Sequence, residues 1–152
     1  MEIKAADVAK LRKMTGAGMM DCKKALVEAE GDFNRAQEII REKGKLVAAK
    51  RSDRETSEGA VVVRLNADNT KAVIVCLGCE TDFVSKNEEF QNLVKAIADV
   101  AIAALPASKD ELLACKMGEG TVQDAITQQT GKSGEKHTLA FYARLEAPYI
   151  AQ

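Results

Sequence analysis

Apolar residues in the first part of the chain recur three and four places apart, which is the spacing of one face of a helix. Three such runs are present, and the first two end at Gly16 and Gly31. Asp32 offers an N-cap for the third run, which we expect to end before Gly44. The three apolar faces comprise Val8, Leu11 and Met14; Met20, Ala25, Leu26 and Ala29; and Phe33, Ala36, Ile39 and Ile40. Three short amphipathic helices in about 45 residues predict a small three-helix bundle.

After Gly59 the spacing changes to that of β-strands. Residues 60–65 and 71–76 are rich in valine and isoleucine, and the turn-forming residues 66–70 join them, so we predict a β-hairpin. Residues 137–145 alternate along the chain and predict a third strand. The residues expected on one face of this strand are His137, Leu139, Phe141, Ala143 and Leu145.

Helical spacing returns between the hairpin and the last strand. The longest run comprises Phe90, Leu93, Val94, Ile97, Val100 and Ala101 and ends near Ala104. The expected boundary residues are Ser85 with Glu88 and Ser108 with Glu111 as two capping boxes, Thr121 as a further N-cap, and Gly131 as a stop. We therefore predict an α+β fold, in which a three-helix bundle precedes a three-stranded antiparallel sheet with helices packed on one side.

A polar connector separates the two patterns. The third helical run ends in a basic cluster, and each of the seven residues that follow it is charged or carries a hydroxyl group. Such a change of composition is typical of a domain boundary. We place a helical domain at residues 1–51, a linker at 52–58 and an α+β core subdomain at 59–152.

Composition narrows the class of partner. The chain has 152 residues and a net charge of -1, so it lacks the strongly basic field typical of proteins that bind nucleic acid or anionic membranes. No apolar run reaches the roughly 18 residues that a membrane-spanning helix needs, and the first residues lack the apolar core of a signal peptide. We expect a cytoplasmic protein whose partner is another protein, with no nucleic acid and no membrane.

The sequence offers little catalytic chemistry. Residues 130–133, Thr-Gly-Lys-Ser, resemble part of a phosphate-binding loop, but Ile126 stands where the loop needs its first glycine, and a helix rather than a strand precedes it. One histidine gives no triad and no set of metal ligands. Cys76 and Cys79 form a C-x-x-C pair, which is typical of thiol redox chemistry or half a zinc site, but they lie at the end of an apolar strand, where structural cysteines are more common. We expect no enzyme activity, no cofactor, no metal and no direct binding of nucleotide.

The turn at residues 80–87 is the segment most suggestive of a contact. An apolar strand stops there and a helical pattern begins, with a carboxylate and an aromatic ring side by side at Asp82 and Phe83. From the residues alone two interpretations stay open. Phe83 is either a core residue beside a turn-forming aspartate or an exposed contact.

Two motifs resemble the elongation factor Ts family, the guanine-nucleotide exchange factors that act on the GTPase elongation factor Tu. One is Thr81-Asp82-Phe83-Val84, and the other is TGAGMMDCKKAL at residues 15–26, preceded by a Leu-Arg pair at 11–12. The resemblance implies a ubiquitin-associated-type fold for the helical domain. Members of the family usually continue into a second, similar core half and a protrusion, so we expect the sequence to be either an N-terminal portion of such a protein, which we favour, or an unusually short member.

The resemblance further implies which residues touch the partner. Phe83 is expected to insert into the nucleotide-binding domain of elongation factor Tu, and Asp82 to perturb the contacts that support the bound magnesium. Thr81 and Val84, on either side of this pair, are also implied as contacts. The remaining implied contacts are Met19, Met20 and Lys23 in the helical domain, Arg51 at its end, and a loop at Ser133 and Gly134. In that loop Ser133 replaces the commoner apolar residue.

Our first hypothesis is a guanine-nucleotide exchange factor that promotes release of GDP from elongation factor Tu. The alternative is a GTPase-binding docking module without exchange activity. Thiol redox chemistry through the C-x-x-C pair is a third, less favoured hypothesis.

Overall fold

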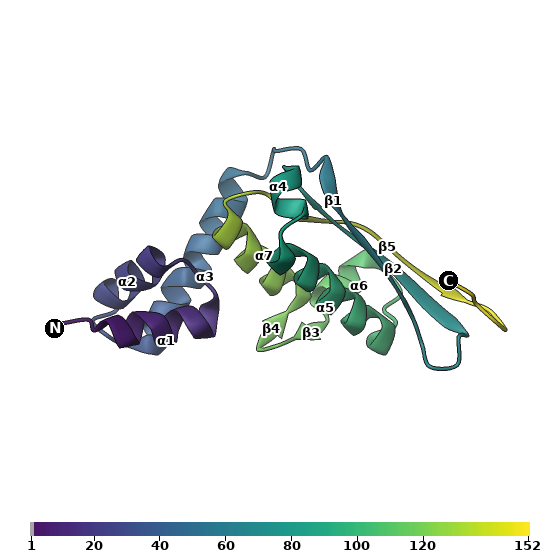
Figure 1. Ribbon diagram of the computed structural model, residues 1–152, viewed down its shortest axis with the longest axis horizontal. Coiled ribbons are helices and arrows are strands. Elements are labelled where there is room, and N and C mark those ends of the chain that lie inside the picture. Colours follow the sequence, from purple (N-terminus) through teal and green to yellow (C-terminus); the bar gives the residue numbers. More distant parts are fainter. Residues whose placement is uncertain (1) are drawn as a thin grey trace.

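The computed structural model describes residues 2–152 and has two parts, a helical bundle at the N-terminus and a sheet covered by helices (Figure 1). The bundle comprises α1 (Ala5–Thr15), α2 (Met19–Glu28) and α3 (Phe33–Lys50). The remaining elements are β1 (Glu58–Leu65), β2 (Lys71–Cys79), α4 (Asp82–Ser85), α5 (Glu88–Ala104), α6 (Lys109–Ala114), β3 (Lys116–Met117), β4 (Gly120–Thr121), α7 (Val122–Ser133) and β5 (Thr138–Glu146). The predicted α+β fold is confirmed.

The start of the bundle follows its local sequence signals. Gly16 caps α1 with a φ of 69°, a left-handed conformation that glycine adopts at little cost. The Asp32 carboxylate accepts hydrogen bonds from the Asn34 and Arg35 amides at 2.8 and 3.1 Å and so begins α3, as predicted. The buried bundle core consists of Val8, Leu11, Ala17, Cys22, Ala25, Leu26, Ala29 and Ala36. Met14 and Met20, which the helical pattern placed on the core faces, are instead exposed.

The three long strands form an antiparallel sheet in the order β1-β2-β5. Helices α5, α6 and α7 lie on one face of this sheet (Figure 1). The core between them includes Val73, Val75, Leu77, Phe90, Val94, Ile97, Leu112, Val122 and Ile126. Strand β2 is central, so its alternate residues are buried against the helices, and the turn that follows it starts from the most firmly held strand of the sheet.

The third strand departs from its predicted faces because its register with β2 shifts by one residue at Ala140. Such a β-bulge turns all later side chains to the opposite face. Leu139 is buried, as expected, whereas Phe141 and Leu145 are exposed, and Tyr142 contacts the core instead. The uncovered face of the sheet therefore displays the apolar side chains of Val61, Ile74, Phe141 and Leu145.

The predicted ends of two helices were wrong for one shared reason. Helix α3 continues through Gly44 to Lys50, and α7 continues through Gly131 to Ser133. A Cβ at Gly131 would lie 2.8 Å from the Gly44 Cα, and one at Gly44 would lie 3.1 Å from the Thr127 carbonyl oxygen. These glycines allow the two helix backbones to approach closely, and they join the bundle to the core.

An ion pair makes a second junction between the bundle and the core. Arg51, the C-cap residue of α3, donates from Nε and Nη2 to the two Glu80 carboxylate oxygens, both at 2.7 Å. Glu80 follows directly after β2, and its side chain is only 13% exposed. The bond from Arg51, partly opposed by burial, lowers the pKa of Glu80 to about 2. The folded structure therefore favours the charged form of the Glu80 carboxylate.

We expect Gly131→Ala to destabilise the protein. In an exposed helix this change stabilises by about 1 kcal/mol, but here the added methyl group meets the backbone of α3. Overpacking of this kind costs roughly 1 to 3 kcal/mol. Urea unfolding followed by circular dichroism measures the effect, with Gln123→Ala on the exposed face of α7 as control. A gain in stability would contradict the close crossing.

We also expect the Arg51–Glu80 pair to make stability depend on pH. The folded pKa of Glu80 lies below its ordinary value of 4.5, so its contribution is complete above that value and is lost as the pH falls towards 2. The free energy of unfolding should therefore decline more steeply for the native chain than for Glu80→Gln from about pH 5 down to about pH 2. Urea unfolding at each pH measures this, and Glu28→Gln, which removes an exposed carboxylate, is the control. If the free energies of unfolding of the native chain and of Glu80→Gln changed in parallel with pH, Glu80 would not be the source of the pH dependence.

Candidate functional site

The candidate site is the turn between β2 and α5, where the four-residue helix α4 stands. Its first turn is closed by hydrogen bonds from the Ser85 and Lys86 amides to the Thr81 and Asp82 carbonyl oxygens, at 3.2 and 3.0 Å. The predicted capping box at Ser85 and Glu88 was wrong. Ser85 belongs to α4 and donates to the Asp82 carbonyl oxygen, and Asn87 caps α5 instead, accepting from the Glu89 amide at 2.8 Å.

Phe83 points out of this turn. Its side chain is 85% exposed, the largest fraction among the large apolar residues that the structure describes as exposed. The core interpretation of Phe83 is therefore wrong. The neighbouring Val84 packs against the core cluster and Ser85 is buried, so one side of the turn is anchored while the ring of Phe83 faces solvent. An exposed ring on an anchored turn is suited to insertion into a partner.

Asp82 lies beside Phe83 with its carboxylate accessible. Its partner in the fold is Lys86, at 3.3 Å and four residues further along, and both side chains are more than half exposed. An exposed pair of this kind contributes little to stability, typically below about 1 kcal/mol. The Asp82 carboxylate can therefore change partners at little cost to the fold.

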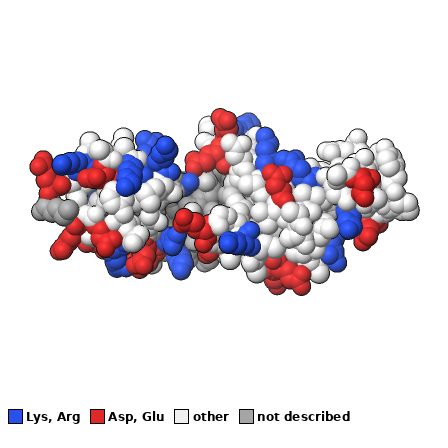
Figure 2. Space-filling model, turned by 90° about the horizontal axis from the view of Figure 1, so that it is seen from below, with Lys and Arg blue, Asp and Glu red and all other residues white. Residues whose placement is uncertain are grey.

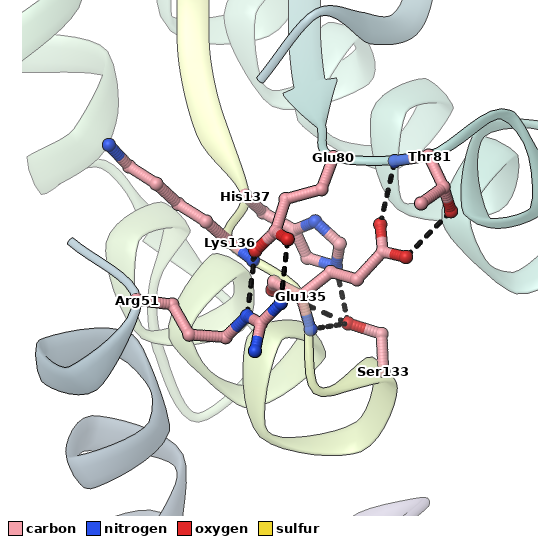
Figure 3. A network of polar contacts seen from close by, with 7 residues as sticks. All are labelled: Arg51, Glu80, Thr81, Ser133, Glu135, Lys136 and His137. Carbon is pink, nitrogen blue, oxygen red and sulfur yellow. Dashed lines mark hydrogen bonds and ion pairs between the residues drawn. The ribbon is translucent and has the colours of Figure 1, made fainter. Parts of the chain in front are cut away.

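Two carboxylates hold the start of the turn through hydrogen bonds (Figure 3). We call this arrangement the carboxylate clasp and define it by Glu80, Thr81, Glu135 and Lys136. Glu135 accepts from the Thr81 amide at 3.0 Å and from the Thr81 hydroxyl at 2.6 Å. In the opposite direction, Glu80 accepts from the Lys136 amide at 2.7 Å. Each carboxylate thus binds the amide of the residue that follows the other.

The predicted loop at Ser133 and Gly134 lies at the end of α7 beside the clasp. Gly134 caps the helix with a φ of 74°, and the Ser133 hydroxyl accepts from the Glu135 amide at 3.1 Å. Ser133 also contacts the Nε2 atom of His137 at 3.0 Å (Figure 3). The structure therefore brings residues 133–134 close to residues 80–81 through Glu135. Ser133 shapes the turn with its hydroxyl, and Gly134 is exposed.

The predicted contacts of the helical domain lie apart from the turn, on α2 at the far end of the bundle (Figure 1). Met19 and Met20 are 54% and 61% exposed, and both belong to the first turn of the helix. Lys23 is exposed one turn later. Two adjacent exposed methionines beside a lysine make a small adaptable contact surface. The site residues thus form two groups on different parts of the molecule.

Arg51 belongs to the group of predicted contacts around the α4 turn, but its guanidinium already binds Glu80. Nε and Nη2 both bind Glu80, and the side chain is about one third exposed. A bidentate arginine–carboxylate pair is among the stronger contacts between side chains. In the free chain Arg51 therefore acts as a structural partner of the clasp.

Cys79 and His137 are both buried. Burial, with a smaller contribution from Glu135, raises the pKa of Cys79 to about 11, which keeps it a thiol. His137 is buried against the edge of Phe90, and burial lowers its pKa. Its Nδ1 atom has no hydrogen-bond partner in the described structure. Within residues 2–152, no group of three or more histidine, cysteine and acidic side chains is arranged to hold a metal ion.

The surface charge is mixed where it can be seen. Lysine and arginine side chains alternate with aspartate and glutamate over the face drawn in Figure 2. None of the helices that the structure describes combines the length and apolar character needed to cross a bilayer.

Sequence reasoning missed Glu135 and Lys136 altogether and gave Glu80 no role. The available signal was an acidic residue in each of the two segments that later meet, Glu80 directly after β2 and Glu135 three residues before β5. Acidic residues at such places are common, so this signal gains meaning only when the fold brings the two segments together.

Comparison with known proteins gives consistent results. The family model "Elongation factor TS" matches residues 80–151. The chain is 53% identical over 149 residues to "Elongation factor Ts" of Christiangramia forsetii, with 98% of this chain and 54% of the relative covered. It is 55% identical over 148 residues to "Elongation factor Ts" of Flavobacterium johnsoniae, with 97% of this chain and 46% of the relative covered.

The chain thus spans about half the length of the curated relatives that it matches. The region that the family model matches contains the turn with Phe83 and all the residues of the carboxylate clasp. Arg51, which binds Glu80 of the clasp, lies outside this region. Over nearly its whole length the chain is therefore similar to proteins named "Elongation factor Ts", of which it corresponds to a part.

Proposed function

We propose that this chain promotes release of GDP from the GTPase elongation factor Tu during translation elongation, in the cytoplasm. The observation that carries the proposal is the exposed Phe83 on an anchored four-residue helix. The relatives with the printed name "Elongation factor Ts" support the choice of partner. The chain would act by binding alone, with no bond made or broken and no cofactor or nucleotide of its own.

Exchange requires that the factor bind the empty GTPase better than the GDP-bound one. The coupling is reciprocal, because GDP must weaken the hold of the factor by the same free energy, typically 1 to 3 kcal/mol. Burying one phenylalanine ring contributes roughly 1.5 to 3 kcal/mol. Insertion of Phe83 into a pocket that opens only when the nucleotide site is distorted therefore supplies a coupling of the required size.

Asp82 has the charge needed for the second part of this action. Its carboxylate stands next to Phe83 and is held only by the exposed Lys86. Once the ring is inserted, a carboxylate at this place can compete for polar contacts that support the bound magnesium. The magnesium belongs to the partner, and its loss of support weakens the hold on the phosphates of GDP.

Met19, Met20 and Lys23 form a separate docking surface in this proposal. They lie on the bundle, away from the turn (Figure 1), so they can contact the GTPase before and after the ring inserts. Binding through this surface is the same in both nucleotide states and raises affinity without itself causing exchange.

A docking module without exchange activity is the second candidate. The observation in its favour is that the chain spans only about half the length of the curated relatives that it matches. The two candidates differ in one measurable property: a docking module binds the GTPase but leaves the rate of GDP release unchanged.

We expect Phe83→Ala to lower the acceleration of GDP release by roughly 10- to 100-fold, because the variant loses the burial of the ring. Asp82→Ala should lower it to a smaller extent. Release of a fluorescent GDP analogue from elongation factor Tu, with increasing amounts of the chain, measures both. Phe141→Ala is the matched control, since Phe141 is also an exposed phenylalanine but lies on the sheet. Equal rates of GDP release with Phe83→Ala and with the native chain would rule out insertion of the Phe83 ring as the cause of exchange.

We expect the double variant Met19→Ala, Met20→Ala to raise the concentration needed for half-maximal acceleration roughly tenfold while the maximal rate stays the same, because docking alone is weakened. The same titration measures both quantities. Val27→Ala, which trims another exposed apolar residue of α2, is the control. A fall in the maximal rate with an unchanged half-maximal concentration would place these methionines in the exchange step instead.

A further inference from the structure

We propose that the carboxylate clasp is the positioning device of the α4 turn, and that Arg51 acts on exchange through Glu80 rather than by contact with the partner. The proposal rests on the proposed exchange function and adds to it the residues that keep Phe83 in place. None of these residues touches the GTPase in this account, so Arg51, Glu80 and Glu135 are positioning residues.

The first ground is the reciprocal geometry of the clasp. Thr81 precedes α4 directly, and both its amide and its hydroxyl are bound by Glu135, at 3.0 and 2.6 Å. Glu80 in turn binds the Lys136 amide at 2.7 Å. Hydrogen bonds to a charged acceptor are roughly twice as strong as neutral ones. Two segments more than 50 residues apart in the sequence are therefore fixed to each other beside the N-terminus of α4.

The second ground is that α4 cannot hold itself. A helix of four residues has too few internal hydrogen bonds to offset the cost of ordering its backbone. The Thr81 side chain makes no capping hydrogen bond to it, and its hydroxyl donates to Glu135 instead. At its other end the turn is held by the packing of Val84 and by a bond from Gln91 Nε2 to the Ser85 carbonyl oxygen at 3.3 Å. The clasp supplies the matching restraint at the start.

The third ground is charge. Two carboxylates that approach the same pair of backbone segments repel each other, and a cation close to one of them offsets part of this cost. Arg51 is such a cation: it pairs with Glu80 through two bonds, and the nearby charge of Glu135 also contributes to the raised pKa of Arg51. The Lys136 ammonium group points elsewhere and donates to the Ser52 carbonyl oxygen at 2.7 Å (Figure 3 shows it turned away from the carboxylates).

These contacts make the bundle and the turn mechanically dependent on each other. Arg51 ends α3, whose first half belongs to the bundle, and Glu80 begins the turn that carries Phe83. If the clasp is loosened, α4 must be ordered when the ring inserts, and that cost falls on the step in which GDP leaves. The maximal rate then falls, whereas docking through α2 is unaffected.

A double-mutant cycle on the full chain tests the role of Arg51. Arg51→Ala and Glu80→Gln should each lower the maximal rate of GDP release, Arg51→Ala by roughly tenfold, with the half-maximal concentration unchanged. The variant with both changes should be no slower than the slower single variant, since the two residues act as one unit. Arg64→Ala, which breaks the Arg64–Asp99 pair at the sheet, is the matched control and should behave like the native chain. Effects of Arg51→Ala and Glu80→Gln that multiply would overturn the proposal, because they would place Arg51 on the partner.

Hydrogen–deuterium exchange of the free chain tests the positioning without the GTPase. Amides of residues 82–87 should exchange roughly tenfold faster in Arg51→Ala and in Thr81→Val, which lacks the hydroxyl that Glu135 binds, while amides of the bundle core keep their protection. Thr81→Ser retains the hydroxyl and should restore both the protection and the maximal rate. Unchanged protection in Arg51→Ala and Thr81→Val would overturn the proposal.

The two readouts separate this proposal from the proposed function. A native chain that leaves GDP release unchanged removes the exchange function, and amide exchange of the free chain still decides whether the clasp holds the turn. The other outcome is that the native chain is active and that Thr81→Val loosens the turn but promotes GDP release at the native rate. That result overturns the role of the clasp in exchange and leaves the proposed function intact.

Discussion

A four-residue helix cannot keep its shape in water by itself, and the presentation of Phe83 depends on whatever holds that helix in place. The restraints come from three directions. The central strand β2 leads into the turn, Val84 anchors it to the core, and Glu135 fixes Thr81 at its start. These restraints keep the turn from collapsing onto the core, so the ring of Phe83 stays exposed.

The same restraints extend to the helical bundle. Helix α3 is continuous from Phe33 to Lys50, so it belongs to the bundle at one end and crosses α7 at the other. At the crossing the contact is between backbones, because Gly44 and Gly131 leave no side chains in between. Beyond the crossing, Arg51 binds Glu80. A close helix contact and a short ion pair at one junction resist both sliding and rotation, and they relate the docking surface on α2 to the turn.

Local signals in the sequence were sufficient for most of the fold. Gly16 and Asp32 act on their own neighbours, and the apolar, β-branched run at residues 71–76 predicted a strand that the structure places at the centre of the sheet. The errors arose where the meaning of a residue depends on a distant one. Gly44 and Gly131 have the composition of helix stops, but each is used for close approach to the other, which no local window reveals.

The candidate site divides in the same way. Phe83 and the methionines of α2 were named from motifs, and the structure shows that their side chains are exposed. The clasp was not predictable, because its two halves are separated by more than 50 residues and each half is an ordinary acidic residue beside a strand. The bulge at Ala140 was equally hidden, since one inserted residue leaves the alternating pattern intact in the sequence while it reverses the faces in the sheet.

Three carboxylates around this turn have different roles because they are in different surroundings. Glu80 is mostly shielded and bound by Arg51, so its charge is fixed in the folded state and its pKa is low. Glu135 is held by the amide and hydroxyl of Thr81, which makes it a restraint on the backbone. Asp82 is exposed and shares only a weak pair with Lys86, so the fold loses little when its charge is used elsewhere. Restraint thus comes from the shielded charges and interaction from the open one, and a single turn can be both rigid and available to a partner.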